Sequence, residues 1–142
     1  MTITTTTSAV SPSTLSASLF RIDKFIVPPA SIPAFLARLR HVMGQLGSLP
    51  GCRQNLVLTQ SGGPGEFNVV TLVEWANAEA MGQARVAMEA FHAQEGFDTE
   101  AFRKQLGIRV DQGTYTLAAA GPGPAQQPRD ASSAARPDLA AV

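Results

Sequence analysis

The sequence predicts one small α+β domain built in the order β-α-β-β-α-β. Three observations predict this class. Four segments are rich in β-branched and aromatic residues, two stretches between them repeat apolar residues at the 3.6-residue spacing of a helix, and Gly and Pro clusters separate these segments. The two ends of the 142-residue chain show no such pattern. The folded unit is therefore predicted at residues 19–117, a size typical of one domain.

Both ends of the chain are predicted to be disordered tails. Residues 1–18 are mostly Thr, Ser and Ala, and residues 118–142 are mostly Ala, Pro, Gly, Gln and Ser without an aromatic residue. Such segments bury too little apolar surface to offset the roughly 1–2 kcal/mol of backbone entropy that ordering costs per residue.

The first strand and the first helix are expected on either side of a proline pair. Residues 19–27 are rich in Phe, Ile and Val and stop at two consecutive prolines, because proline cannot donate to a strand ladder and keeps the preceding residue extended. Ser31 can cap the helix that follows, whose apolar pattern covers residues 32–46. Gly47 then ends it.

The middle of the chain predicts a hairpin followed by a helix. Residues 53–60 and 67–75 have the composition of strands, and the glycine-rich turn at residues 61–65 is short enough that they should pair antiparallel. Asn77 is an acceptable N-cap for a second amphipathic helix that is expected to run to about Gln94.

The last segments complete the fold. A short helix is expected at residues 99–107 and a fourth strand at residues 108–117, in which Gly113 suggests a β-bulge. This order of elements is the split βαβ, or ferredoxin-like, pattern, in which a four-stranded antiparallel sheet carries its helices on one face.

The third strand is apolar on both of its faces. Val70 and Leu72 alternate with Val69 and Val73, so the face of the sheet away from the helices should also be buried. A second copy of the chain is the economical cover, which predicts a sheet-on-sheet homodimer.

Composition and charge exclude several classes of function. Eleven basic and eleven acidic residues are interspersed, so binding to nucleic acid or to an anionic membrane is not expected. The single Cys52 excludes an intrachain disulfide, and the two distant histidines, His41 and His92, have no metal-ligand spacing. Without a signal peptide or an apolar run that could span a bilayer, the protein is expected to be cytoplasmic.

Four of these features together resemble the antibiotic biosynthesis monooxygenase domain, a family of the dimeric α/β barrel superfamily. They are the close of the first strand before its helix, the Leu49-Pro-Gly-Cys52 link, the Glu74-Trp75 strand end and the Asn77-Ala-Glu-Ala80 helix opening. The resemblance covers about residues 20–117. It implies a homodimer whose two sheets face each other, with a small-molecule pocket in each subunit between the sheet and its own helices.

The resemblance also implies an activity. Characterised members of the family oxidise aromatic polyketide quinols or hydroquinones with molecular oxygen, without metal, flavin or haem. The implied partners are therefore a small aromatic substrate and oxygen, with no cofactor. The alternative is a non-enzymatic dimer that binds a small apolar metabolite, or an accessory or stress protein. Haem-degrading relatives carry an axial histidine about ten residues beyond the strand-end Trp, where this chain has Gln83-Ala-Arg-Val86, so haem cleavage is disfavoured.

Two residues of the sheet are candidates for catalysis. Trp75 is either a pocket wall or a large core residue that bridges the sheet and the second helix. Asp23 stands among apolar residues of the first strand, at the position where haem-cleaving relatives carry Asn. A partly buried carboxyl group there could have a raised pKa and take a phenolic proton. Otherwise it forms an ion pair with a basic residue, for which the candidates are Arg21, Lys24 and Arg109.

Four further residues are weaker candidates. His92 could be a general acid or base near neutral pH, or a surface residue of the second helix. Arg85 on the same helix could hold a substrate carboxylate or phenolate, or simply be solvated. Asn55 and Tyr115, on the second and fourth strands, could bind substrate, but the suspected bulge leaves open which side they face.

Overall fold

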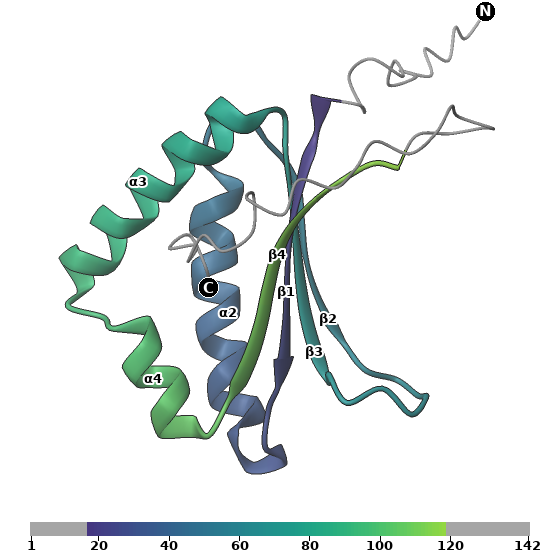
Figure 1. Ribbon diagram of the computed structural model, residues 1–142. Coiled ribbons are helices and arrows are strands. Elements are labelled where there is room, and N and C mark those ends of the chain that lie inside the picture. The colour runs from purple at the N-terminus through teal and green to yellow at the C-terminus, as the bar shows by residue number, and fades with distance from the viewer. Residues whose placement is uncertain (1–16, 119–142) are drawn as a thin grey trace, which may run out of the picture.

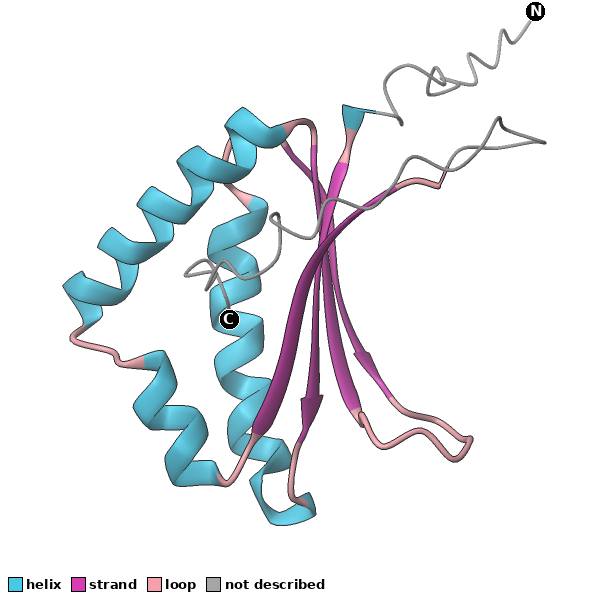
Figure 2. Cartoon of the chain, in the orientation of Figure 1, coloured by secondary structure: helices cyan, strands magenta, loops and turns pink. Residues whose placement is uncertain are grey.

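A computed structural model describes residues 17–118, and within this range the elements follow the order that the sequence predicts, with one turn of 3-10 helix before α2 (Figure 1). Four strands form one antiparallel sheet in the order β2-β3-β1-β4. They are β1 (Leu19–Ile26), β2 (Cys52–Thr59), β3 (Val69–Trp75) and β4 (Arg109–Thr116). The helices are α2 (Ile32–Gly47), α3 (Ala78–Glu95) and α4 (Thr99–Leu106). All three lie on one face of the sheet (Figure 2). The predicted ferredoxin-like α+β fold is confirmed.

Local chemistry sets the ends of α3 and α4. The side chains of Asn77 and Asp98 each accept a hydrogen bond from the backbone amide three residues further along, and so cap the two helices. Gly96 and Gly107 end the same helices with positive φ angles of 64° and 72°, which glycine adopts without a Cβ clash.

Two local expectations are wrong. Ser31 does not cap α2 with its side chain; its hydroxyl donates to the Leu106 carbonyl at 2.9 Å and so ties the start of α2 to the end of α4. Gly113 is not in a bulge, because β1 and β4 pair past it without a register shift, and the irregularity lies at the start of β2. A Cβ at Gly113 would come within 2.8 Å of the Tyr115 ring, so this ring would have to move if the glycine were replaced.

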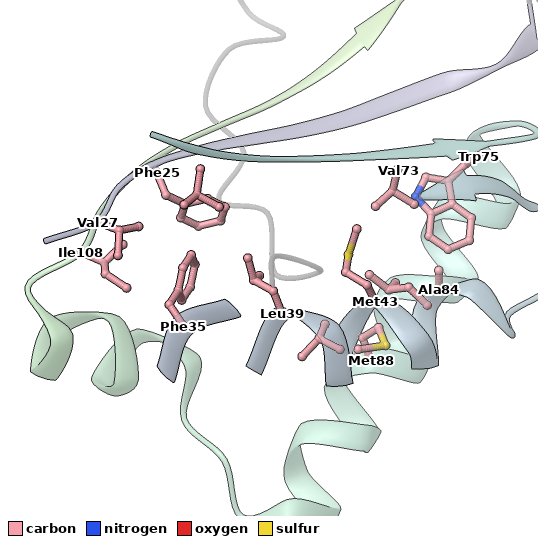
Figure 3. Close-up of a cluster of buried hydrophobic side chains, with 13 residues drawn as sticks. Phe25, Val27, Phe35, Leu39, Met43, Val73, Trp75, Ala84, Met88 and Ile108 are labelled. Atoms are coloured by element: carbon pink, nitrogen blue, oxygen red, sulfur yellow. The ribbon is translucent and has the colours of Figure 1, made fainter. Parts of the chain in front are cut away.

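The hydrophobic core lies between the sheet and the helices. Phe25 of β1 packs edge-on against Phe35 of α2, with ring centroids 4.8 Å apart. Figure 3 shows Trp75 at the end of β3, on the side of the sheet where Met43 of α2 and Ala84 of α3 also lie. The bridging core position expected for Trp75 is therefore the one it occupies.

The two faces of the sheet differ in their cover. Strand alternation places the odd-numbered residues of β1 and β3 beneath the helices, on what we call the covered face, and the even-numbered ones on the other side. No described helix lies on that other side, which we call the open face (Figure 1). Its apolar side chains are Phe20, Ile22, Leu56, Leu58, Val70, Leu72 and Tyr115. The homodimer that would bury them stays a prediction.

The predicted tails lie outside the described residues except at their inner edges. Ser18, counted with the N-terminal tail, is buried and donates to the Glu74 carboxylate at 2.7 Å. Among the helices of the described residues, none is long and apolar enough to cross a membrane.

Candidate functional site

Polar side chains gather in the middle of the covered face, between the helices and the sheet. Arg21 and Asp23 come from β1, and the strand register sets Asp23 between Thr71 of β3 and Gln112 of β4. Arg103 of α4 lies close enough to interact electrostatically with Asp23. We call these five residues the inner polar cluster.

An ion pair lies at the centre of the inner polar cluster. Arg21 Nε donates to Asp23 Oδ1 at 2.5 Å, and the two residues are only 5% and 1% exposed. Of the three basic residues considered from the sequence, Arg21 is thus the partner. Burial raises the pKa of the Asp23 carboxyl group, and the opposing effects of Arg21 and of a hydrogen bond from Gln112 do not cancel it.

The cluster holds more positive than negative charge. Two guanidinium groups, those of Arg21 and Arg103, stand beside one carboxylate, and burial lowers the pKa of Arg103. Glu100 also attracts the Arg103 charge, but its side chain is exposed to solvent and is not part of the cluster. Such an arrangement can accommodate an additional anionic oxygen, because guanidinium groups form strong, directed hydrogen bonds to oxyanions.

A second polar group joins α2 and α3. Arg38 Nη2 lies 2.9 Å from His92 Nδ1 and 2.9 Å from Glu95 Oε1, and Glu95 Oε2 lies 2.6 Å from His41 Nε2. The Arg38 guanidinium also stacks on Phe97, with its central carbon 3.4 Å from the ring centroid. The contacts with Glu95 and Phe97 therefore keep the Arg38 guanidinium beside His92.

His92 is an interior residue and not a surface one. It is 9% exposed and continues the buried stripe of α3, in which Met88 lies about one turn earlier and Ala84 about two turns earlier. Burial, reinforced by the Arg38 charge, lowers the pKa of His92, while Glu95 opposes this effect. The neutral imidazole is therefore favoured near neutral pH.

The other three candidates lie away from the inner polar cluster. Arg85 is exposed on α3. Asn55 donates through Nδ2 to the Met43 carbonyl at 2.9 Å, which ties β2 to α2. Tyr115 is 44% exposed on the open face of β4, across the sheet from Asp23.

Sequence reasoning missed several polar residues of the interior. Thr71 of β3 and Gln112 of β4 each lie opposite Asp23. Strand alternation indicates the face of a residue, but the register that brings these three together comes from the structure. Arg38 and Arg103 are on helices. The apolar periodicity of a helix indicates which side faces the core, but it does not indicate which residue an arginine contacts.

The comparison with protein families decides where the chain belongs. The family model described as antibiotic biosynthesis monooxygenase matches residues 19–96. The chain belongs to the antibiotic biosynthesis monooxygenase family. No curated protein matches it.

Solved structures share the fold of this family member. A putative monooxygenase from Shewanella loihica PV-4 is 16% identical with a TM-score of 0.51, covering 74% of this chain and 98% of that one. A conserved protein from Methanosarcina mazei Go1 is 16% identical with a TM-score of 0.59, covering 75% and 98%. The heme-degrader MhuD from Mycobacterium tuberculosis, whose structure has two hemes in its active site, is 18% identical with a TM-score of 0.52, covering 73% and 99%. Likenesses at this identity show the fold alone.

Residues 83–86, which the resemblance sets against the axial histidine of haem-degrading relatives, lie on α3. In this member Ala84 is buried in the core there and Arg85 is exposed. Across residues 17–118, no group of three or more His, Cys, Asp or Glu side chains could hold a metal ion. Burial raises the pKa of the lone Cys52, which favours its protonated thiol.

Proposed function

We propose that this member of the antibiotic biosynthesis monooxygenase family is a cofactor-independent monooxygenase that oxidises a small aromatic metabolite with molecular oxygen. The metabolite is a quinol, a phenol or a polyketide-like compound. The inner polar cluster carries the proposal, because it combines a buried carboxyl group of raised pKa with two arginines on the covered face. Family membership supports the type of reaction.

In the proposed reaction, Asp23 takes the phenolic proton while Arg21 and Arg103 favour the resulting phenolate. The electron-rich phenolate passes an electron to oxygen, and recombination of the two radicals forms a carbon–oxygen bond to a peroxide. Where the attacked carbon is a ring CH2 group, loss of water leaves a carbonyl. One oxygen atom then remains in the product and the other leaves as water. The substrate supplies all four electrons, so no external reductant is needed.

Trp75 is proposed as a wall of the substrate site. It lies on the same covered face as Asp23, at the end of β3, and the register sets it opposite Leu19, four positions before Asp23 on the neighbouring strand. Its large flat surface can stack on an aromatic ring, and its burial in the core keeps that surface in place.

We also propose that a second copy of the chain covers the open face. Leu56 and Leu58 of β2 are 43% and 47% exposed there, on an apolar surface that continues across β3 and β1 through Leu72 and Ile22. Contiguous exposed apolar surface of this kind marks an interaction site, and a self-complementary sheet face suits a two-fold dimer.

Oxygen uptake tests the proposed reaction directly. Purified, chelator-treated protein is supplied with a panel of hydroquinones and anthrones, and wild type is compared with Asp23→Asn and Trp75→Phe. Uptake is expected in wild type, with a rate about 10²–10⁴-fold lower in Asp23→Asn because the general base is lost. Trp75→Phe should reduce the rate less. Glu89→Gln is the matched control, because Glu89 is an exposed carboxylate on α3.

Two results would overturn this assignment. Equal rates in wild type and Asp23→Asn would remove Asp23 from the mechanism. Binding of the aromatic compounds without oxygen uptake would favour the alternative, a dimer that binds small molecules without oxidising them.

A further inference from the structure

Arg38 determines which nitrogen of His92 carries the proton. A guanidinium group has only donors, so at the 2.9 Å contact Arg38 Nη2 donates and His92 Nδ1 accepts. An imidazole nitrogen that accepts a hydrogen bond has no proton. The neutral ring must therefore carry its proton on Nε2.

The charges around His92 preserve this state. Arg38 and His41 face it from α2 and Glu95 faces it from α3. Burial lowers the pKa of His92, Arg38 and His41 lower it further, and Glu95 opposes them. Glu95 also accepts from the same Arg38 nitrogen that donates to His92, so Arg38 is kept in its donating position.

The proton on Nε2 is a buried donor without an acceptor. Among the described residues, His92 Nε2 is buried and has no hydrogen-bond partner, and the same is true of Arg38 Nε. Both atoms are donors. Buried donors are ordinarily paired, so an interior that lacks acceptors in this way suits a ligand that brings them.

His92 lies on the side of α3 that faces the layer between the helices and the sheet. It shares the inward stripe of α3 with Ala84 and Met88, both of which are core residues, and the inner polar cluster lies in the same layer. A ligand that occupied this layer would need one oxygen for the arginines of the cluster and another for His92.

We propose that His92 donates a hydrogen bond from Nε2 to a carbonyl or phenolate oxygen of the substrate, and that the substrate is a hydroxylated quinone or quinol with at least two acceptor oxygens. This rests on the proposed function, because it takes the substrate as the occupant of the interior. His92 then acts as neither a general base nor a metal ligand, since both roles need a lone pair on Nε2.

Nitrogen NMR of the isotope-labelled protein tests the tautomer without any ligand. At neutral pH the ring correlations of His92 should show a protonated Nε2 and an unprotonated Nδ1. Arg38→Met, which removes the donor to Nδ1, should give a mixture of tautomers. A proton on Nδ1 in the wild-type protein, or on both nitrogens, would overturn the proposal.

Ligand titrations test the donor. The probes are lawsone, a hydroxylated naphthoquinone that is an anion at neutral pH, and naphthalene, which has the same rings without oxygen; binding is followed by the fluorescence of Trp75, the only tryptophan. His92→Phe should weaken lawsone binding about tenfold and leave naphthalene binding unchanged. His92→Gln, whose amide N–H can replace Nε2–H, should stay within about threefold of wild type for lawsone. Thermal melting checks that both variants fold.

The outcomes separate this proposal from the oxidation itself. If lawsone binding depends on His92 as expected but no quinol causes oxygen uptake, the proposed monooxygenase activity is overturned. The donor role of His92 then still stands. No lawsone binding by wild type, or equal losses for lawsone and naphthalene in His92→Phe, overturns the donor role. Oxygen uptake that is indifferent to His92→Phe likewise overturns it while the proposed function stands.

Discussion

The two faces of the sheet are made by the same four strands and have nearly opposite surfaces. On the covered face, Arg21 and Asp23 are almost fully buried, while on the open face the side chains of Leu56 and Leu58 are close to half exposed. Charged residues of globular proteins are almost never fully buried unless they are paired, and large exposed apolar patches are uncommon on monomers. The covered face is therefore unusual for its buried charges, and the open face is unusual for its exposed apolar side chains.

The two departures have different causes. Burying an ion pair is weak as a source of stability, because desolvation offsets much of the attraction, so its presence beneath the helices fits a chemical role. The open face contains one buried carboxylate, Glu74, and both of its oxygens accept hydrogen bonds, one from Ser18 and one from Gln54. This satisfied group could remain buried beneath a second copy. The covered face is thus suited to a ligand and the open face to a protein surface.

The largest effect is expected from Asp23→Ala on the covered face. It should lower the free energy of unfolding by about 3–5 kcal/mol, because it removes the carboxylate beside the buried Arg21 guanidinium. The double variant Arg21→Met with Asp23→Leu should recover part of that loss, since it removes both charges of the buried pair and leaves only Arg103 without the carboxylate. Urea unfolding measures all three proteins.

Lys24→Ala is the matched control for this comparison. Lys24 lies next to Asp23 in sequence but on the open face, with its ammonium group 5.3 Å from the Phe67 ring centroid. Its loss should cost no more than about 1 kcal/mol. If Asp23→Ala cost as little as Lys24→Ala, the two faces would not differ in the way described.

A charge on the open face should act on association instead of on the fold. Leu58→Asp places two carboxylates in a symmetric sheet-on-sheet interface and is expected to weaken dimerisation about a hundredfold. Sedimentation equilibrium measures the change. Val86→Asp is the control, because Val86 is 62% exposed on α3 and away from the sheet. A wild-type protein that sediments as a monomer at micromolar concentration would contradict the proposed cover.

Most of the fold could be predicted from local signals. Asn77 and Gly96 mark the two ends of α3 through chemistry that involves only neighbouring residues, and the predicted bounds of each strand differ from the observed ones by two residues or fewer. The exposed apolar face was indicated by Val70 and Leu72 in β3, because strand alternation needs no tertiary information.

The site was harder to predict because its contacts are distant in the sequence. Arg38 and His92 are 54 positions apart, and no periodicity links them. Tyr115 and Asn55 were left without an assigned face because Gly113 suggested a bulge, and a slip of one residue exchanges the two faces of a strand. Gly113 instead pairs regularly with Ile22, and its closeness to the Tyr115 ring is visible only once the side chains are placed.

The smallest expected effect is a pH dependence of stability. It should come from the interior beneath the helices and not from the open face. The pKa of His92 is lowered in the fold from an ordinary value of 6.5, so the unfolded chain binds the proton more readily and stability falls as the pH drops below that value. His92→Gln should lose less stability than wild type between about pH 7.5 and about pH 5.5, as measured by urea unfolding at each pH. Asp23 acts with the opposite sign, because its raised pKa makes the folded chain the better proton acceptor. Since Asp23 is present in both proteins, its contribution cancels in their difference, and equal losses would mean that His92 is not held neutral by the fold.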